Sequence, residues 1–130
     1  LRSVVFRQSC IYGPRQFGTE DQKREFLSRC AQGAISAFLL TEPDVGSDPA
    51  RLAATATPVE GGAAYEIDGL KLWTTNGVIA ELLVVMARVP EHDGGRGGIT
   101  AFVVEADSPG ITVVRVNPSR VRLVLGSSRS

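Results

Sequence analysis

Residues that commonly hold metals or build disulfide scaffolds are scarce in this chain. Its 130 residues include only two cysteines and one histidine. Neither Cys10 nor Cys30 belongs to a Cys-x-x-Cys motif, so we expect both to be reduced thiols in an intracellular protein. His92 lies alone in a glycine-rich loop, whereas a metal site needs several converging ligands. The sequence therefore predicts no metal site.

Neither an excess of charge nor a long apolar run is present. The 14 basic residues balance the 14 acidic ones, so electrostatics give no reason to expect nucleic acid as a partner. No apolar run approaches the roughly 20 residues of a transmembrane helix, and the N-terminus lacks the apolar segment of a secretory signal. We expect a protein of the cytoplasm or the mitochondrial matrix. Because the chain begins at Leu1 rather than Met, we also expect a fragment.

The first 34 residues are predicted to be helical. The segment Thr19-Glu20-Asp21-Gln22 has the form of a capping box, with a threonine N-cap and a glutamine three residues later. Gly33 is placed to end this helix in a left-handed cap. We expect an earlier helix at residues 1–12, broken by Gly13-Pro14.

Short strands separated by turns are predicted beyond Ala34. The expected strands cover residues 35–40, 53–59, 65–67, 70–73, 82–89, 99–105 and 111–116. Asp68-Gly69 is the two-residue signal of a type I′ hairpin turn, and Ser108-Pro109-Gly110 is expected to join a further strand pair. Residues 82–89 are apolar enough to be covered on both faces. The fold class that follows is mainly β: an antiparallel β-barrel domain preceded by one or two α-helices.

Residues 38–48, Phe-Leu-Leu-Thr-Glu-Pro-Asp-Val-Gly-Ser-Asp, join an apolar strand to a polar turn. Thr41 and Ser47 can donate hydrogen bonds, and Gly46 allows another molecule to approach the backbone closely. Pro43 fixes the turn because its ring locks φ. This pattern is suited to a ring with carbonyl and phosphate groups, and it is equally compatible with an ordinary solvent-facing loop.

A second segment, residues 64–77, reads Ala-Tyr-Glu-Ile-Asp-Gly-Leu-Lys-Leu-Trp-Thr-Thr-Asn-Gly. Together the two segments resemble the middle, β-barrel domain of acyl-CoA dehydrogenases. That family carries Leu-Thr-Glu-Pro-x-x-Gly-Ser-Asp, matched here at Leu40–Asp48. It then carries Tyr-x-(Ile/Leu)-(Asn/Asp)-Gly-x-Lys-x-Trp-(Ile/x)-(Thr/Ser)-Asn-Gly, matched here at Tyr65–Gly77. Two long motifs in order are a more specific signal than a lone glycine pattern.

The resemblance implies a division of the chain into three parts. Residues 1–34 would be the end of an N-terminal helical domain, since Gly18–Lys23 resembles the family's Gly-Thr-Glu-x-Gln-Lys. Residues 35–116 would be the flavin- and acyl-CoA-binding β-barrel domain. Residues 117–130 do not match the family and form a divergent tail, which either supplies an edge strand at 121–125 or is a non-native end.

The resemblance also implies FAD as cofactor and acyl-CoA as substrate. The flavin-contacting positions of the family fall on Phe38, Leu40, Thr41, Gly46, Ser47, Trp73, Thr74 and Thr75, and Ser47 would also contact acyl-CoA. The Trp73 indole would pack on the ring face away from substrate, with the Thr75 hydroxyl near N5. Considered without the motifs, Trp73 would be a core residue and the threonines ordinary strand residues.

Three charged residues near the motifs are expected to be structural. Lys71 should pack its stem and have its charge solvated or paired. Glu42 and Asp48 flank a turn, so we expect them to accept local backbone hydrogen bonds rather than to form an acid–base pair.

The function that the resemblance implies is α,β-dehydrogenation of acyl-CoA thioesters in fatty acid metabolism, with hydride transfer to flavin N5. The catalytic base would come from a C-terminal helical domain, so no residue here is predicted to be catalytic and the isolated chain should be inactive. Expected partners are an electron acceptor such as an electron-transfer flavoprotein and, in the complete protein, further copies in a homo-oligomer. The alternatives are an acyl-CoA oxidase, a flavin monooxygenase relative, or a non-catalytic barrel remnant.

Overall fold

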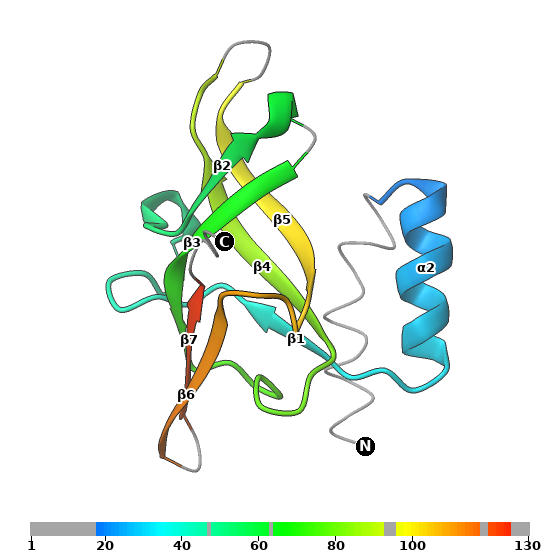
Figure 1. Ribbon diagram of the computed structural model, residues 1–130. Helices are drawn as coiled ribbons and strands as arrows, with labels where there is room; N and C mark the ends of the chain where they lie inside the picture. Colours follow the sequence, from blue (N-terminus) through cyan, green and yellow to red (C-terminus); the bar gives the residue numbers. More distant parts are fainter. Residues whose placement is uncertain (1–17, 47, 63, 93–95, 118–119, 126–130) are drawn as a thin grey trace.

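The computed structural model describes residues 18–46, 48–62, 64–92, 96–117 and 120–125, and the predicted helix at 1–12 lies outside them. Its elements are α2 (Glu20–Ala31), β1 (Ser36–Leu39), η1 (Pro49–Arg51), β2 (Thr55–Val59), η2 (Glu60–Gly62), β3 (Ala64–Leu72), β4 (Leu82–Val89), β5 (Gly98–Glu105), β6 (Ile111–Asn117) and β7 (Arg120–Leu125). Most of these residues form one curled sheet, and α2 stands to one side of it (Figure 1). The prediction of a mainly β, barrel-like fold behind a helix is confirmed.

Helix α2 begins and ends as its sequence predicts. The Thr19 hydroxyl accepts the N–H of Gln22 at 3.2 Å, and the Gln22 side chain accepts the N–H of Thr19 at 2.9 Å, which completes the capping box. At the other end Gly33 adopts a φ of 114°, and the N–H of Ala34 reaches back to the Arg29 carbonyl at 3.0 Å. The Arg29 guanidinium also pairs with Glu105 of β5, with 2.9 Å between Nη2 and Oε2. Helix and sheet are therefore linked by an ion pair.

The strands form a sheet with the order β1-β4-β2-β3-β7-β6, and β5 pairs with β4. Strand β4 runs antiparallel to β5 from end to end, whereas β1 lies parallel to its first half. A single parallel bridge joins Thr55 of β2 to Arg88 of β4, in the half of β4 that does not pair with β1. Because β4 has neighbours on both edges and is buried on both faces for most of its length, the expectation of a fully covered strand is confirmed.

The predicted hairpin at Asp68-Gly69 is wrong. Strand β3 runs without a break through both residues. Up to Asp68 it pairs antiparallel with β2, which is reached through the turn at η2, and from Gly69 it pairs with β7. Gly69 is required for another reason: a Cβ at this position would lie 2.5 Å from the Cβ of Ala54. The glycine therefore permits close approach of two chain segments, which is a second meaning of glycine inside a strand.

The predicted pairing around Ser108-Pro109-Gly110 is also wrong. The two strands that this turn connects exist, but β5 pairs with β4, and β6 pairs with β7. The possible edge strand at 121–125 is an internal strand instead, because β7 pairs with β3 as well as with β6. The pairing of β3 with β7 joins residues far apart in the sequence, whereas β5 and β6 each pair with the strand next to them along the chain.

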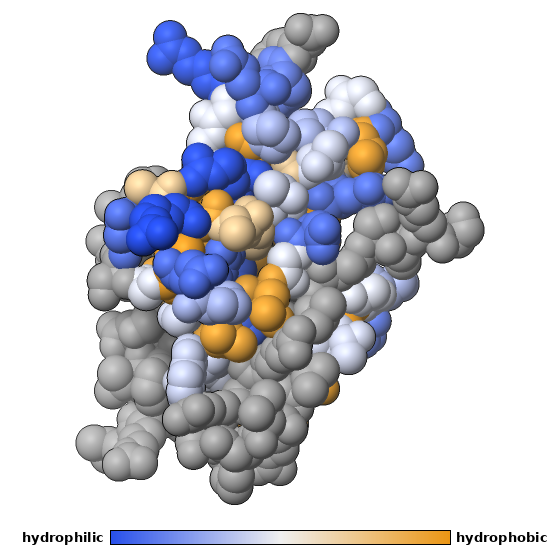
Figure 2. Space-filling model, turned by 90° about the vertical axis from the view of Figure 1, so that its left-hand side faces the viewer, coloured by the Kyte–Doolittle hydropathy of each residue, from blue (hydrophilic) through white to orange (hydrophobic). Residues whose placement is uncertain are grey.

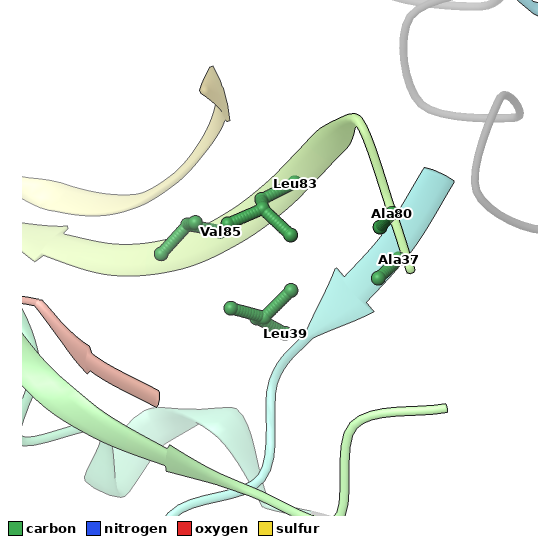
Figure 3. Close-up of a cluster of buried hydrophobic side chains, with 5 residues drawn as sticks. All are labelled: Ala37, Leu39, Ala80, Leu83 and Val85. Atoms are coloured by element: carbon green, nitrogen blue, oxygen red, sulfur yellow. The ribbon is translucent and has the colours of Figure 1, made fainter. Parts of the chain in front are cut away.

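A buried apolar cluster holds β1 against β4 (Figure 3). Its members are Ala37, Leu39, Ala80, Leu83 and Val85, and all of them except Ala80 are fully buried. A second cluster, of Ala54, Ala56, Ala87 and Val89, joins β2 to the other half of β4. The partly buried Ile67 of β3 packs against both clusters. Strand β1 is thereby fixed next to β4 up to Leu39, where the polar turn begins.

Among the residues that the structure describes, no helix is both long and apolar enough to pass through a membrane.

Candidate functional site

The two motif segments meet in the fold, as the sequence predicts. The Leu72 N–H at the end of β3 donates to the Thr41 carbonyl at 2.8 Å, just beyond the end of β1. The Lys71 amine reaches the Leu40 carbonyl at 3.3 Å. Residues some thirty positions apart are therefore hydrogen bonded at the point where each segment turns polar.

A buried ion pair lies behind this junction. Lys71 Nζ is 2.7 Å from Glu42 Oε1, and the two side chains are 0% and 3% exposed. The Glu42 carboxylate also accepts the backbone N–H of Ala53 at 2.6 Å and of Ala54 at 3.1 Å. The expectation that Lys71 is paired is confirmed, and Glu42 does accept backbone hydrogen bonds. The expectation that they are local is wrong for Glu42, because Ala53 and Ala54 follow it by 11 and 12 residues.

The burial and the hydrogen bonds act in opposite directions on the pKa of Glu42. Burial is the largest influence and alone would raise it, but the bonds from Lys71, Ala53 and Ala54 together hold the pKa below its ordinary value. Burial also lowers the pKa of Lys71, and the neighbouring carboxylate offsets only part of that effect. Glu42 is consequently a carboxylate at neutral pH, already bonded on both oxygens and unsuited to proton transfer. Asp48 accepts the N–H of Ala50 at 3.0 Å, which is the local bond expected of it.

Large hydrophobic side chains are exposed at several places on the described surface. They are Phe38, Tyr65, Trp73, Val78, Ile79, Ile99 and Val113. The face shown in Figure 2 is correspondingly mixed, with hydrophobic groups gathered toward its middle and hydrophilic groups around them. Three of the exposed side chains, Phe38, Tyr65 and Trp73, belong to the two motif segments.

Trp73 is a surface residue held in an uncommon backbone conformation. Its side chain is 50% exposed, which excludes the alternative of a core tryptophan. Its φ of 58° lies in the left-handed region, which bulky residues seldom adopt and which costs about 1–3 kcal/mol. Phe38, on β1, is 44% exposed. Both motifs thus present a large aromatic side chain to the surface, and one of them does so with strain.

The turn after Trp73 separates the two neighbouring threonines. Thr74 is buried and Thr75 is exposed, and the Thr74 carbonyl accepts the N–H of Gly77 at 3.3 Å. The Thr74 hydroxyl has no hydrogen-bond partner among the described residues. Burying a hydroxyl without a partner costs about 1–3 kcal/mol, and the Ser36 hydroxyl is buried in the same way among the described residues. The resemblance placed the Thr75 hydroxyl near N5, and the burial of Thr74 was not predicted from the sequence.

The remaining predicted positions lie along the turn that follows β1. Leu40 and Thr41 are half-buried, and Gly46 is exposed with open space where a Cβ would be. The turn is closed by two backbone hydrogen bonds between Glu42 and Val45, of 3.0 and 3.2 Å. Ser47 lies outside the described residues.

A cleft of about 390 Å³ opens beside the same turn. Its lining residues are Glu42, Pro43, Asp44, Val45, Arg51, Ala53, Ala54, Thr55, Asp68, Gly69 and Leu70. None of the predicted flavin-contacting positions is among them. The predicted flavin-contacting positions therefore do not form this cleft.

The comparisons with known proteins agree with the fold and with the two motifs. The acyl-CoA dehydrogenase middle domain family matches residues 37–121. The probable acyl-CoA dehydrogenase FadE10 of Mycobacterium tuberculosis is 77% identical over 100 residues, which is 77% of this chain and 15% of that protein. Human mitochondrial very long-chain specific acyl-CoA dehydrogenase is 44% identical over 101 residues, 74% of this chain and 15% of that protein.

A solved structure resembles the fold over nearly the whole chain. A glutaryl-CoA dehydrogenase from Mycobacterium smegmatis in complex with FADH2 has a TM-score of 0.83 and 33% identity, covering 97% of this chain and 33% of that one. The chain belongs to the acyl-CoA dehydrogenase family and contains its middle domain. It spans about 15% of the length of the curated relatives named above.

Proposed function

We propose that this chain supplies the flavin-contacting surface of an FAD-dependent acyl-CoA dehydrogenase, which acts on the CH–CH bond next to the thioester of its substrate. The observation that carries the proposal is the half-exposed Trp73 in a strained conformation, one residue from the Leu72–Thr41 hydrogen bond. Strain of this kind persists where the surrounding structure imposes it and is concentrated at functional sites. The family membership of the chain and the FADH2-bound structural relative support the same assignment.

The residues present suit the chemical character of an isoalloxazine ring. The flat faces of the ring need an aromatic or aliphatic wall, which the Trp73 indole offers. Its polar edge needs amides and short hydroxyls, which Thr41, Thr74 and Thr75 offer, and the Thr74 hydroxyl lacks any other partner among the described residues. Phe38 and Leu40 would complete the wall at the end of β1. When bound, the flavin supplies the hydride chemistry, while the protein orients the ring and tunes its electronics.

The polar turn is assigned to the phosphate-bearing parts of the ligands. In this proposal Gly46 and Ser47 approach the FAD pyrophosphate, and Ser47 also contacts acyl-CoA. The open space around Gly46 supports close approach of a ligand to the backbone. No catalytic base is assigned within this chain, and the complete protein would supply it from elsewhere. An electron-transfer flavoprotein as acceptor, a homo-oligomer, and a location in the cytoplasm or mitochondrial matrix complete the proposal.

The proposal can be tested with the fluorescence of the single tryptophan. Because Trp73 is the only tryptophan of the chain, quenching of its emission on titration with FAD reports contact at this surface. We expect saturable quenching by FAD and, more weakly, by riboflavin, which lacks the pyrophosphate. Adenosine diphosphate serves as the control for nucleotide binding without a flavin ring and should leave the emission unchanged. Emission unaffected by FAD, or affected equally by adenosine diphosphate, contradicts the proposal.

A further inference from the structure

The Lys71–Glu42 pair connects three separate chain segments. Lys71, from β3, contacts the Leu40 carbonyl at the end of β1 and the Glu42 carboxylate in the following turn. Glu42 in turn accepts the amides of Ala53 and Ala54, ahead of β2. One buried cluster thus joins the two motif segments to each other and to the start of a third strand.

Buried charges of this kind need a reason other than stability. Removing an amine and a carboxylate from water is costly, and apolar residues of similar volume often replace such a pair without loss of stability. Hydrogen bonds are directional, however, and packing of apolar side chains is not. Every polar contact of Lys71 and Glu42 described above is aimed at a particular backbone atom or at the partner. The pair is suited to fixing a geometry.

The geometry that it fixes is that of the proposed flavin-contacting surface. Thr41 lies in sequence between Leu40 and Glu42, both of which Lys71 holds. Leu72, whose N–H binds the Thr41 carbonyl, lies between Lys71 and Trp73. The pair therefore restrains the Thr41 peptide on both sides and is anchored two residues before the strained Trp73.

We propose that Lys71 and Glu42 are positioning residues, which set the spacing between the Thr41 hydrogen-bonding edge and the Trp73 indole and so determine how the flavin is held. This inference rests on the proposed function. Neither residue touches the reacting atoms. The effect of each is exerted through the backbone of its neighbours, and a misplacement of about 1 Å at such a surface can cost about a hundredfold in function.

The test compares variants that remove the buried ion pair with a variant that shortens a buried apolar side chain. Lys71→Met removes the buried amine, and Glu42→Gln combined with Lys71→Met removes both charges, so that a folded variant is available if the single change leaves an unpaired carboxylate that unfolds the chain. Val85→Ala is the matched control, because Val85 is fully buried in the β1–β4 cluster but is not part of the ion-pair cluster. All are measured well below their melting temperatures.

Two readouts distinguish positioning from general stability. Without ligand, hydrogen exchange of the Leu72 amide should accelerate about tenfold or more in the Lys71 variants relative to amides of β4, and not in Val85→Ala. With FAD, the Lys71 variants should bind about tenfold or more weakly and shift the absorption band of bound flavin, while Val85→Ala binds as the parent does. If Val85→Ala changes the Leu72 exchange rate and the FAD affinity as much as the Lys71 variants do, for the same loss of melting temperature, the inference is overturned.

The ligand-free readout separates this inference from the proposed function. Suppose that the Leu72 amide loses its protection from hydrogen exchange in the Lys71 variants while FAD leaves the Trp73 emission of the parent unchanged. That result would support the positioning geometry and contradict flavin binding. Flavin binding by the parent with unchanged Leu72 exchange in the Lys71 variants would support the proposed function and overturn the positioning role.

Discussion

The Leu72 N–H donates to the Thr41 carbonyl at 2.8 Å and so ties the end of β3 to the end of β1. Each partner is followed by an abrupt change in the chain: Thr41 by the Glu42–Val45 turn, and Leu72 by the left-handed Trp73. The two motif segments are thereby hydrogen bonded to each other where each leaves its strand.

Removing one partner of the buried pair should be much more harmful than removing both charges. Lys71→Met leaves the Glu42 carboxylate buried without its amine, and we expect a loss of about 3–5 kcal/mol in the free energy of unfolding. Glu42→Gln in the same chain should recover a large part of that loss. Urea unfolding of the two single variants, the double variant and the parent measures the coupling. Additive losses would contradict the pairing.

The stability of the chain should fall in acid in a way that depends on Glu42. The pKa of Glu42 is below its ordinary value of 4.5 in the folded chain, so the carboxylate stabilises the fold fully above that value. Its contribution is lost as the pH falls from 4.5 through the lower, folded pKa. Urea unfolding between pH 7 and pH 3 should show this slope, and Glu42→Gln should flatten it.

A change at Glu105 provides the comparison for the acid experiment. The hydrogen bond from Arg29 also lowers the pKa of Glu105, but this carboxylate is 43% exposed and its pairing is screened by solvent. Glu105→Gln should therefore flatten the slope less than Glu42→Gln does. A larger effect at Glu105 would contradict the importance assigned to burial.

Two glycines of the motifs should differ in their tolerance of the same substitution. Gly69→Ala would place its Cβ 2.5 Å from the Ala54 Cβ and 2.8 Å from the Ala54 Cα, so the backbone of β3 must move. We expect a loss of about 1–3 kcal/mol. Gly46→Ala meets no atom within 4 Å and should leave the free energy of unfolding nearly unchanged. Thermal unfolding of both variants checks this; equal losses would contradict the close approach of β3 to Ala54.

Trp73→Gly should separate function from stability. Glycine adopts the φ of 58° without strain, and the indole it removes is half exposed, so we expect the free energy of unfolding to change by about 1 kcal/mol or less. FAD binding, measured by equilibrium dialysis, should be lost. Trp73→Phe keeps an aromatic face at the same position and should retain measurable binding. Unimpaired FAD binding by Trp73→Gly would contradict the assigned wall.

Local features were predictable from the sequence, and features set by distant contacts were not. The capping box at Thr19 and the left-handed Gly33 each depend on residues within one helical turn, and both formed as expected. Asp68-Gly69 has the composition of a turn, but its glycine is required by Ala54, which no local pattern indicates. The turn at Ser108-Pro109-Gly110 connects β5 to β6 without pairing them, because β5 pairs with β4 before it and β6 pairs with β7 after it.

In the candidate site, too, some features were predictable from the sequence and others were not. The motifs indicated that the segments around Thr41 and Trp73 meet, and the Leu72–Thr41 hydrogen bond confirms it. The burial of Thr74 rather than Thr75 follows from the turn that β3 makes after Leu72, and alternation along a strand cannot give it. The hydrogen bonds that Ala53 and Ala54 donate to the Glu42 carboxylate were likewise not predictable from the sequence.

The most direct measurement of the central claim is the flavin content of a segment exchange. Residues 37–121 of this chain, the part that matches the family, would replace the corresponding segment of the mycobacterial FadE10 protein. The same exchange carrying Trp73→Gly serves as the control. We predict that the purified exchange protein retains stoichiometric FAD and that the control loses it. A folded exchange protein without FAD, or a control with undiminished FAD, would contradict the account.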